Sequence, residues 1–356
     1  MAQHTKRDYC VSRDSVLQAY KDFQSPASSV RRTPVMQGSR TLIPPALKSL
    51  GCELYFKLEM FQRSGSFKFR GASNAVGSIK RENDGMDPKD KVVVTVSSGN
   101  FAQGAALAAQ NFGLQAKIVM PENTTKIKVD AVRSYGAEVE FCHPNERDEH
   151  CALVVQSLKE RARFIHPSED PRVIAGNGTL CVEFIEQVDN QFGGQKLDVI
   201  VVPVGGGGVI SGVAAYARSE NIMVVGAEPI LADDAYRSKL LGSIQGHRIP
   251  GQTPNTVAEG LRTTLGPNTF PVVRDFVHSI IPVSEEGILR AMRLIFERLK
   301  CVAEASSCVA YAALDTPEFL QVLKENFAGK ARINIGIVLT GGNVDFDPYF
   351  NNLSKY

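Results

Sequence analysis

Short apolar runs alternate with longer amphipathic segments along the middle of the chain. After residue 91 the runs have the length of strands, and the segments between them carry apolar residues at helical spacing. This alternation is typical of βαβ units, in which parallel strands are joined by helices. We expect strands over 92–97, 116–120 and 138–142, alternating with helices over 101–111, 125–135 and 148–163.

The alternation resumes after residue 198. Residues 198–204, DVIVVPV, are apolar after the first position, as in a strand that is covered on both faces of a parallel sheet. We expect a helix over 209–218, a strand over 222–227 and another apolar strand over 333–339. The Gly-, Pro- and Thr-rich stretch 242–268 is predicted to be a long loop.

These two series predict an α/β protein with two domains. Residues 91–170 would form a small, mobile domain around one parallel sheet. Residues 1–90 would have to join 171–356 to complete a large domain, which would hold the second sheet.

Composition excludes several classes of protein. Of the 356 residues, 43% are hydrophobic and 22% are charged, which excludes a disordered chain and allows a core large enough to enclose a ligand. The 40 basic and 38 acidic side chains leave a net charge of +2, so nucleic acid is not an expected partner. The sequence has no signal-like apolar stretch near its start and no run of membrane-spanning length, so we expect a cytoplasmic protein with no membrane partner. Seven cysteines without a C-x-x-C pair fit neither a disulfide framework nor a zinc site.

Four consecutive glycines, Gly205, Gly206, Gly207 and Gly208, lie between an expected buried strand and the following helix. Backbone N–H groups and the helix dipole converge at such a turn and bind anions, above all phosphate. A tight turn alone would need only one or two glycines. The glycine loop (residues 205–208) therefore favours a ligand that carries a phosphate.

Two kinds of nucleotide site compete for this loop. Glu228 follows at the end of the next strand, where an acid that binds the ribose of a dinucleotide would stand. The glycine register argues against a dinucleotide, because the third glycine of G-x-G-x-x-G falls on Ile210 or Ser211. The Walker sequence G-x-x-x-x-G-K-[ST] is absent as well, which leaves a monophosphate ester.

Lys68 stands in the sequence SGSFKFRG, between Phe67 and Phe69 and just after a helix N-cap that we expect at Ser66. The positive end of the helix dipole and the apolar neighbours both disfavour an ammonium group. The pKa of Lys68 should therefore fall, and its neutral amine should become available as a nucleophile. The alternative is a surface lysine whose stem passes the two rings.

Polar groups also follow two of the expected strands. Ser97 and Ser98 precede Gly99 and Asn100 at the start of a helix, and Thr340 begins the sequence TGGN after the last apolar strand. Ligands bind at such strand ends in open parallel sheets, although Ser98 or Asn100 could simply cap the helix. No G-x-S-x-G sequence supports a serine nucleophile. A nucleophilic lysine, a phosphate cradle and polar strand ends together indicate an aldehyde cofactor with a phosphate tail, held as a Schiff base.

Four motifs stand in order along the chain: SGSFKFRGA at 64–72, SSGN at 97–100, GGGG at 205–208 and TGGNVD at 340–345. Together they resemble the fold-type II pyridoxal-phosphate enzymes, and within these the serine racemase and serine/threonine dehydratase family. The resemblance extends over nearly the whole chain. It implies an α/β fold like that of the tryptophan synthase β subunit, with two open, twisted, mostly parallel sheets and the active site between the domains.

The resemblance also assigns cofactor contacts to several of these residues. Lys68 would form the Schiff base with pyridoxal 5'-phosphate, and Phe67 would lie beside the cofactor. Asn100 would contact the ring hydroxyl, Thr340 the pyridine nitrogen, and the glycine loop the phosphate. A neutral hydroxyl at Thr340 would leave the ring nitrogen largely unprotonated.

By the same resemblance, Ser98 would stand on the ring face opposite Lys68. Racemisation needs one group to remove the α-proton and another to return it from the other face, whereas elimination of water needs only one of them. Ser97, Asn100 and Phe101 would also contact the substrate. Phe101 departs from the family, in which many members have histidine, so binding of the substrate carboxylate would rest more on backbone N–H groups.

Glu228, Asp234 and the backbone carbonyl of Ala232 match the family's site for a divalent cation. Oxygen ligands of this kind suit Mg²⁺, Ca²⁺ or Mn²⁺. The alternative is that Asp233 and Asp234 merely start a helix after Pro229. The resemblance further implies a homodimer and leaves a nucleotide effector open.

The sequence therefore predicts a pyridoxal-phosphate enzyme that acts on a small hydroxy amino acid. It would racemise serine and also dehydrate L-serine to pyruvate and ammonia. The nearest alternative is an L-threonine, L-serine or 3-hydroxyaspartate ammonia-lyase without physiological racemisation. A non-catalytic sensor of small molecules could retain the phosphate cradle, but it would have no reason to keep Lys68 and Ser98 together.

Overall fold

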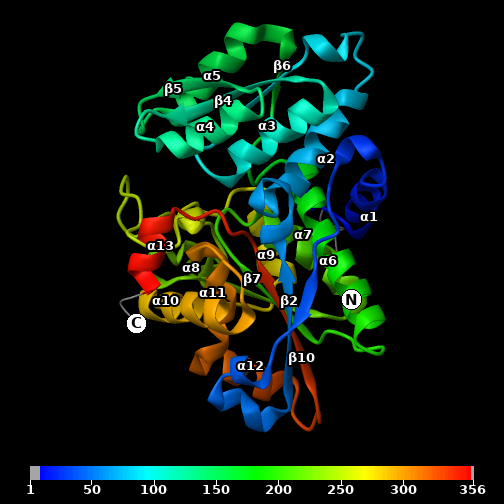
Figure 1. Cartoon of the computed structure of the whole chain (residues 1–356), viewed down its shortest axis with the longest axis vertical. Helices are drawn as coiled ribbons and strands as arrows, with labels where there is room; N and C mark the ends of the chain where they lie inside the picture. Colours follow the sequence, from blue (N-terminus) through cyan, green and yellow to red (C-terminus); the bar gives the residue numbers. More distant parts are fainter. Residues whose placement is uncertain (1–8, 354–356) are drawn as a thin grey trace, which may run out of the picture.

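The computed structural model describes residues 9–353, and the strands in this range form two separate sheets (Figure 1). The larger sheet has six strands in the order β1-β2-β10-β7-β8-β9. Strand β1 pairs antiparallel with β2, and the other pairs in this sheet are parallel. The strands are β1 (Val35–Gln37), β2 (Cys52–Leu58), β7 (Val199–Pro203), β8 (Met223–Pro229), β9 (Ser279–Val283) and β10 (Ile333–Leu339).

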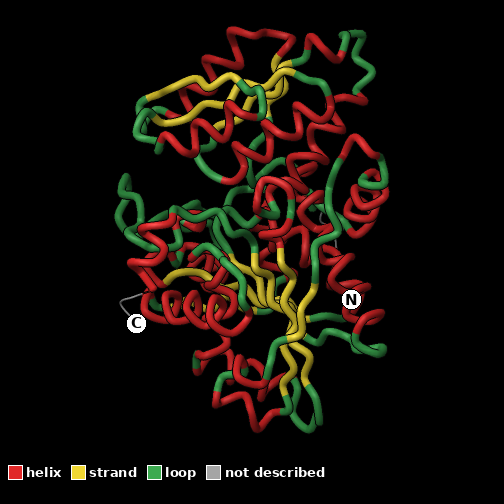
Figure 2. The backbone as a smooth tube through the Cα atoms, in the orientation of Figure 1, coloured by secondary structure: helices red, strands yellow, loops and turns green. Residues whose placement is uncertain are grey.

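The smaller sheet is parallel throughout and lies at the opposite end of the molecule, at the top of Figure 1. Its strand order is β5-β4-β3-β6. The bounds are β3 (Val92–Val96), β4 (Gln115–Pro121), β5 (Glu138–Cys142) and β6 (Ala162–Phe164). Figure 2 shows the two groups of strands separated by helices and loops.

Helices cover both faces of the larger sheet. Apolar residues of α10, α11, α12 and α13 form one hydrophobic core with it, and those of α1, α6, α7 and α9 form the other. The helices are α1 (Arg13–Asp22), α2 (Lys68–Arg81), α3 (Asn100–Phe112), α4 (Lys126–Ser134), α5 (Arg147–Leu158), α6 (Pro171–Gln191), α7 (Gly208–Ala217), α8 (Asp234–Leu241), α9 (Thr269–Phe276), α10 (Glu285–Leu294), α11 (Ala305–Ala312), α12 (Pro317–Asn326) and α13 (Phe346–Leu353). No helix among residues 9–353 combines the length and the hydropathy that crossing a bilayer needs.

The predicted βαβ series is confirmed in its main elements, with one error. The helix expected over 148–163 ends at Leu158 as α5, and residues 162–164 form β6 instead. Lys159 has a φ of +51°, a left-handed conformation that ends the helix. Neither glycine nor proline stands there to signal the break in the sequence.

The polar strand ends all follow the carboxyl ends of parallel strands. β10 is buried along its whole length between β2 and β7, and Thr340 comes directly after it. The glycine loop follows β7, and Glu228 lies near the end of β8. Ser97 follows β3 in the smaller sheet. Ligands bind at this edge of open parallel sheets.

Helix α2 lies between the two sheets (Figure 1). Its apolar residues, among them Phe69, Ala72 and Val76, belong to the hydrophobic core of the smaller sheet. This helix comes from the part of the chain that the sequence assigns to the large domain. The domain division, with 91–170 as the small domain, stays a prediction, and its outermost residues, 1–8 and 354–356, lie outside the described range.

Candidate active site

Lys68 occupies the first turn of α2, beside the end of β10. The backbone N–H of Phe67 donates to the carbonyl of Thr340 at 3.0 Å, and Ser66 forms a β-bridge with Gly341. The predicted N-cap at Ser66 is wrong, because Phe67 is the N-cap and no side chain of the described residues caps this helix. Ser66 is instead fully buried, and its hydroxyl finds no hydrogen-bond partner within residues 9–353.

The amine of Lys68 lies between two aromatic rings. Nζ is 5.1 Å from the ring centroid of Phe67 and 5.9 Å from that of Phe101, and it donates to the carbonyl of Pro167 at 3.3 Å. Burial lowers the pKa of Lys68 to about 8, and Glu304 opposes this shift. A larger share of Lys68 is therefore neutral near physiological pH than for an ordinary lysine.

The glycine loop is packed so closely that side chains do not fit. A Cβ at Gly206 would lie 2.5 Å from Oγ of Ser168, and one at Gly208 would lie 2.9 Å from the carbonyl oxygen of Ser168. Gly207 has a φ of +81° and serves as the N-cap of α7. The loop thus presents bare backbone at a helix N-terminus, which fits a phosphate group.

Asn100, in the first turn of α3, is joined to Glu304. Its Nδ2 donates to both carboxylate oxygens of Glu304, at 2.9 and 3.1 Å, and its Oδ1 accepts from Asn343 at 2.9 Å. Burial raises the pKa of the Glu304 carboxyl to about 7, although the hydrogen bond from Asn100 lowers it. The sequence predicts a contact of Asn100 with the cofactor ring, and the structure places its amide in this network.

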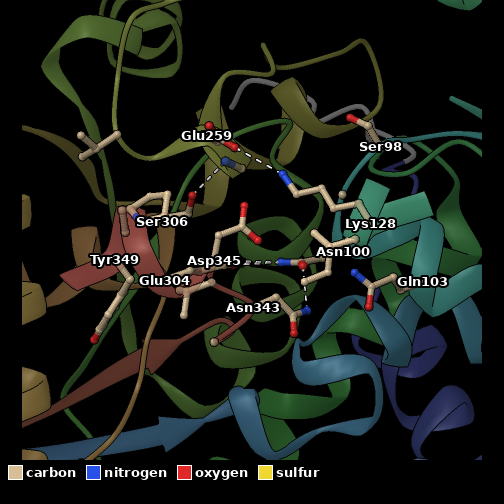
Figure 3. A pocket seen from close by; sticks show the side chains of 18 of the residues that line it. Ser98, Asn100, Gln103, Lys128, Glu259, Glu304, Ser306, Asn343, Asp345 and Tyr349 are labelled. Atoms are coloured by element: carbon tan, nitrogen blue, oxygen red, sulfur yellow. Dashed lines mark hydrogen bonds and ion pairs between the residues drawn. The ribbon is translucent and has the colours of Figure 1, made fainter. Parts of the chain in front are cut away.

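A cavity of about 490 Å³ borders this network (Figure 3). Its lining includes Ser98, Asn100 and Glu304, whereas Lys68 and the glycine loop lie outside the cavity. In Figure 3 the Ser98 side chain lies apart from the pair formed by Asn100 and Glu304. Lys128 of α4 reaches across to Glu259, with a distance of 3.5 Å between the charged groups.

The structure does not give Ser98 the role of a helix cap. Helix α3 has Gly99 as its N-cap, with no hydrogen bond from a capping side chain of the described residues. The hydroxyl of Ser97 accepts a hydrogen bond from the N–H of Gly99 at 3.2 Å. Ser98 lines the cavity and is half-buried, so its hydroxyl is available to a ligand.

The predicted cation ligands meet near the end of β8. Glu228 and Asp234 are 1% and 2% exposed, and Ala232 closes the short helix Ile230–Ala232 between them. The carboxylate of Glu228 accepts from the N–H groups of Ala235 and Tyr236, at 3.2 and 2.6 Å. Among residues 9–353, no group of three or more His, Cys, Asp or Glu side chains is placed to hold a metal. A cation here would therefore need the backbone carbonyl and water besides the two carboxylates.

The alternative of a simple helix start at Asp233 is only partly supported. Asp233 is the N-cap residue of α8, but its side chain makes no capping hydrogen bond within the described part of the chain. Its carboxylate instead pairs with Arg237 and Arg248. Glu228 supplies the acceptors for the helix N-terminus, and a carboxylate is favourable at that position.

Three residues near the site escape the sequence analysis. Glu304, Lys128 and Ser168 belong to no recognisable motif. Glu304 is the most informative of them, because it is the one acid in the otherwise apolar and small stretch 301–310. An acid in such a stretch is a signal that burial and a partner are to be expected.

Comparison with known proteins decides the family. A family model described as pyridoxal-phosphate dependent enzyme matches residues 28–341. The chain belongs to this family. The serine racemase of Homo sapiens is 39% identical over 342 residues, which cover 95% of this chain and 92% of that protein.

Solved structures agree with this family. The serine racemase of maize superposes with a TM-score of 0.83 at 37% identity, covering 98% of each chain. A bacterial-type threonine deaminase, from T.th., superposes with a TM-score of 0.77 at 37% identity, covering 95% of this chain and 100% of that one. The predicted α/β fold of the fold-type II pyridoxal-phosphate enzymes is confirmed, and pyridoxal phosphate is the cofactor of the chain.

Proposed function

We propose that the protein interconverts the enantiomers of serine and also dehydrates L-serine to pyruvate and ammonia. Relatives named serine racemase are 39% and 41% identical over most of the chain. The observation that carries the proposal is the position of Lys68. Its amine has a lowered pKa and lies next to the end of β10, where Thr340 is buried.

The residues present fit pyridoxal phosphate. Pyridoxal phosphate, when bound, supplies an aldehyde that reacts with amines and a ring that withdraws electrons from the carbon bearing the α-proton. Lys68 would hold the aldehyde, and the backbone N–H groups of the glycine loop would hold the phosphate. Phe67 and Asn100 would flank the ring. Thr340 would offer its hydroxyl to the ring nitrogen.

The two reactions differ in what they ask of the chain. Both need a base that removes the α-proton, and we assign this role to the amine of Lys68. Racemisation also needs an acid on the other face, and we assign this role to the hydroxyl of Ser98. Ser97, Asn100 and Phe101 would hold the substrate between these groups. The buried ring of Phe101 offers no hydrogen bond, so the substrate carboxylate would be bound by N–H groups near the start of α3.

An ammonia-lyase acting on L-threonine, L-serine or 3-hydroxyaspartate is the second candidate. The structural likeness to a threonine deaminase at 37% identity favours it. The two candidates are separated by incubating the purified enzyme with L-serine, D-serine, L-threonine and 3-hydroxyaspartate, and measuring keto acid and enantiomer together. D-serine formed from L-serine, alongside pyruvate, is the expected result. Keto acid without any D-serine would favour the ammonia-lyase.

The same resemblance supports further proposals. Glu228, Asp234 and the carbonyl of Ala232 would hold a divalent cation, Mg²⁺, Ca²⁺ or Mn²⁺, with water completing the shell. The burial of both carboxylates at the end of β8 supports this site. We also propose a cytoplasmic homodimer and a nucleotide effector, which follow from the sequence analysis.

A further inference from the structure

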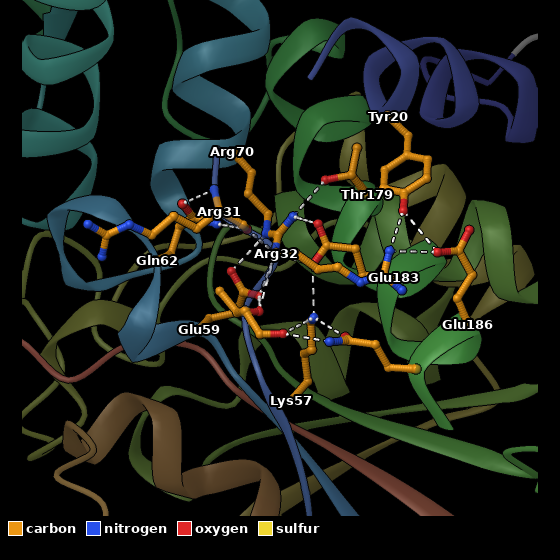
Figure 4. Close-up of polar contacts among 12 residues, drawn as sticks. Tyr20, Arg31, Arg32, Lys57, Glu59, Gln62, Arg70, Thr179, Glu183 and Glu186 are labelled. Atoms are coloured by element: carbon orange, nitrogen blue, oxygen red, sulfur yellow. Dashed lines mark hydrogen bonds and ion pairs between the residues drawn. The ribbon is translucent and has the colours of Figure 1, made fainter. Parts of the chain in front are cut away.

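Arg70 lies entirely buried beneath the helix that carries Lys68 (Figure 4). Its Nε and Nη2 donate to the carboxylate of Glu59, at 2.8 and 2.9 Å. Its Nη1 and Nη2 donate to the carboxylate of Glu183, both at 2.8 Å. One guanidinium therefore connects the segment after β2 with the middle of α6.

Lys57 completes the charge balance of this network. Its Nζ donates to Glu183 at 2.9 Å, to Gln187 at 2.7 Å and to the carbonyl of Thr33 at 2.9 Å. Two cations, Arg70 and Lys57, thus face two carboxylates. These three hydrogen bonds of Lys57 join β2 to α6 and to the segment before β1, and none of them reaches α2.

The charged state of the network is well supported. Burial alone would lower the pKa of Arg70, but the carboxylates of Glu59 and Glu183 outweigh it and raise this pKa. Burial would raise the pKa of Glu183, and Arg70 with Lys57 lowers it to about 2. Replacing a buried network of this kind by well-packed apolar residues is often neutral or stabilising. Stability alone therefore gives a weak reason for it, and fixed geometry gives a better one.

The backbone next to Arg70 is held just as closely. The N–H of Gly71 donates to Oδ1 of Asn177 in α6 at 3.1 Å. A Cβ at Gly176 would lie 2.7 Å from the carbonyl oxygen of Arg70, so α2 and α6 cross at near contact. The first turn of α2, which begins with Lys68, is thereby tied to the larger sheet and its helices.

The rest of α2 belongs elsewhere. Phe69, Ala72 and Val76 pack in the core of the smaller sheet. Without a fixed first turn, Lys68 would follow the smaller sheet, whereas the glycine loop and Thr340 follow strands of the larger one. The buried network attaches the lysine to the same frame as the cradle.

We propose that Arg70 is a positioning residue for Lys68. By gripping Glu59 and Glu183 it sets the first turn of α2, and so the place of the Lys68 amine relative to the glycine loop. The inference rests on the proposed role of Lys68 in holding pyridoxal phosphate. Arginine is suited to this task because its planar fork engages two carboxylates at once, which lysine cannot do.

The test compares Arg70→Lys with Lys57→Met in the holoenzyme. Both substitutions disturb the same buried network, but only the first touches α2. Three properties are measured: the melting temperature, the rate at which pyridoxal phosphate dissociates, and the visible circular dichroism of the bound cofactor. Borohydride reduction followed by peptide mapping shows which lysine carries the cofactor.

Both variants should melt at lower temperature than the wild type. Arg70→Lys should speed cofactor dissociation at least about tenfold and change the circular dichroism of the cofactor band, because small displacements of a reacting group have large effects. Lys57→Met should stay within about twofold of the wild type and keep its spectrum. If Arg70→Lys does not fold, Thr33→Val replaces it, since Oγ1 of Thr33 donates to Glu59 at 2.6 Å and so orients the carboxylate that Arg70 grips.

Two outcomes would overturn the inference. Equal changes in both variants, in proportion to their loss of stability, would mean that the network is merely structural. An unchanged dissociation rate and spectrum in Arg70→Lys, with the reduced adduct at Lys68, would refute the positioning role and leave the proposed function intact. An adduct on another lysine in the wild type would refute the proposed role of Lys68 and this inference with it.

Discussion

The side-chain amide of Asn100 donates two hydrogen bonds to Glu304, with Nδ2 at 2.9 and 3.1 Å from the carboxylate oxygens. Asn100 begins α3, which packs with the smaller sheet, and Glu304 precedes α11, which packs on the larger one. The pair therefore connects the two halves of the molecule next to the site. The raised pKa of Glu304, about 7, makes this connection depend on pH.

Glu304→Gln tests this dependence. Since burial raises the folded-state pKa of Glu304 above its model value of 4.5, the protonated carboxyl favours the folded state. Its contribution to stability is complete below about pH 4.5 and is lost as the pH rises through about 7. The melting temperature of Glu304→Gln, relative to the wild type, should therefore rise by a few degrees between pH 5 and pH 8.

The exposed Glu286, which pairs with Arg290 on the surface of α10, provides the control. Glu286→Gln should differ from the wild type by the same amount at both pH values. A similarly constant difference for Glu304→Gln would show that the ionisation of Glu304 is not linked to folding.

Lys68→Ala should abolish both racemisation and elimination and remove the absorbance band of the covalently held cofactor. Lys68 is the one lysine that we place at the end of β10, and its amine has no substitute there. The measurement is the visible spectrum together with both activities. Mapping of the borohydride-reduced adduct in the wild type to a different lysine would contradict the assignment.

Gly206→Ala should weaken the binding of pyridoxal phosphate much more than that of pyridoxal, which lacks the phosphate. The added Cβ would lie 2.5 Å from Oγ of Ser168, so either the loop or the serine must move. A loss of at least about tenfold in affinity for the phosphate ester is expected, which is the value of one good hydrogen bond to a charged group. Gly246, whose Cβ would meet no atom of the described residues within 4 Å, provides a control variant, Gly246→Ala. Equal losses for both ligands would argue against a phosphate cradle.

Asp234→Asn should remove the response of the protein to divalent cations. A cation that binds the native state at about 100 times its dissociation constant stabilises it by about 2.7 kcal/mol. Chelator-treated wild type should therefore melt at higher temperature after Mg²⁺, Ca²⁺ or Mn²⁺ is added, and the variant should not. A wild type that melts at the same temperature with and without each of these ions holds no functional cation there.

The fold was largely predictable because parallel strands covered on both faces leave long apolar runs. β7 and β10 are buried at every position, and each stands out in the sequence. The short β6 was missed because its three residues are only partly buried and follow a helix without a glycine or proline. Lys159 ends that helix by adopting a positive φ, a choice that depends on packing rather than on residue type.

The site was predictable where chemistry needs a local motif and not where it needs distant partners. The glycine loop and Lys68 each carry their signal within a few neighbouring residues. Glu304 is linked to Asn100 across 204 positions, and Glu183 to Arg70 across 113, so neither pairing leaves a mark in the sequence. Ser66 shows the opposite error: its local pattern suggests a helix cap, but pairing with Gly341 takes precedence.

The central claim is that one chain runs two reactions that differ by one proton donor, and Ser98→Ala tests it most directly. The measurement follows D-serine and pyruvate together from L-serine, in the wild type and in the variant. Racemisation should fall at least about a hundredfold, in the range for losing a general acid, while pyruvate formation from L-serine survives in part and that from D-serine is lost. Equal losses of racemisation and of elimination from L-serine, or a wild type that forms no D-serine at all, would contradict the account.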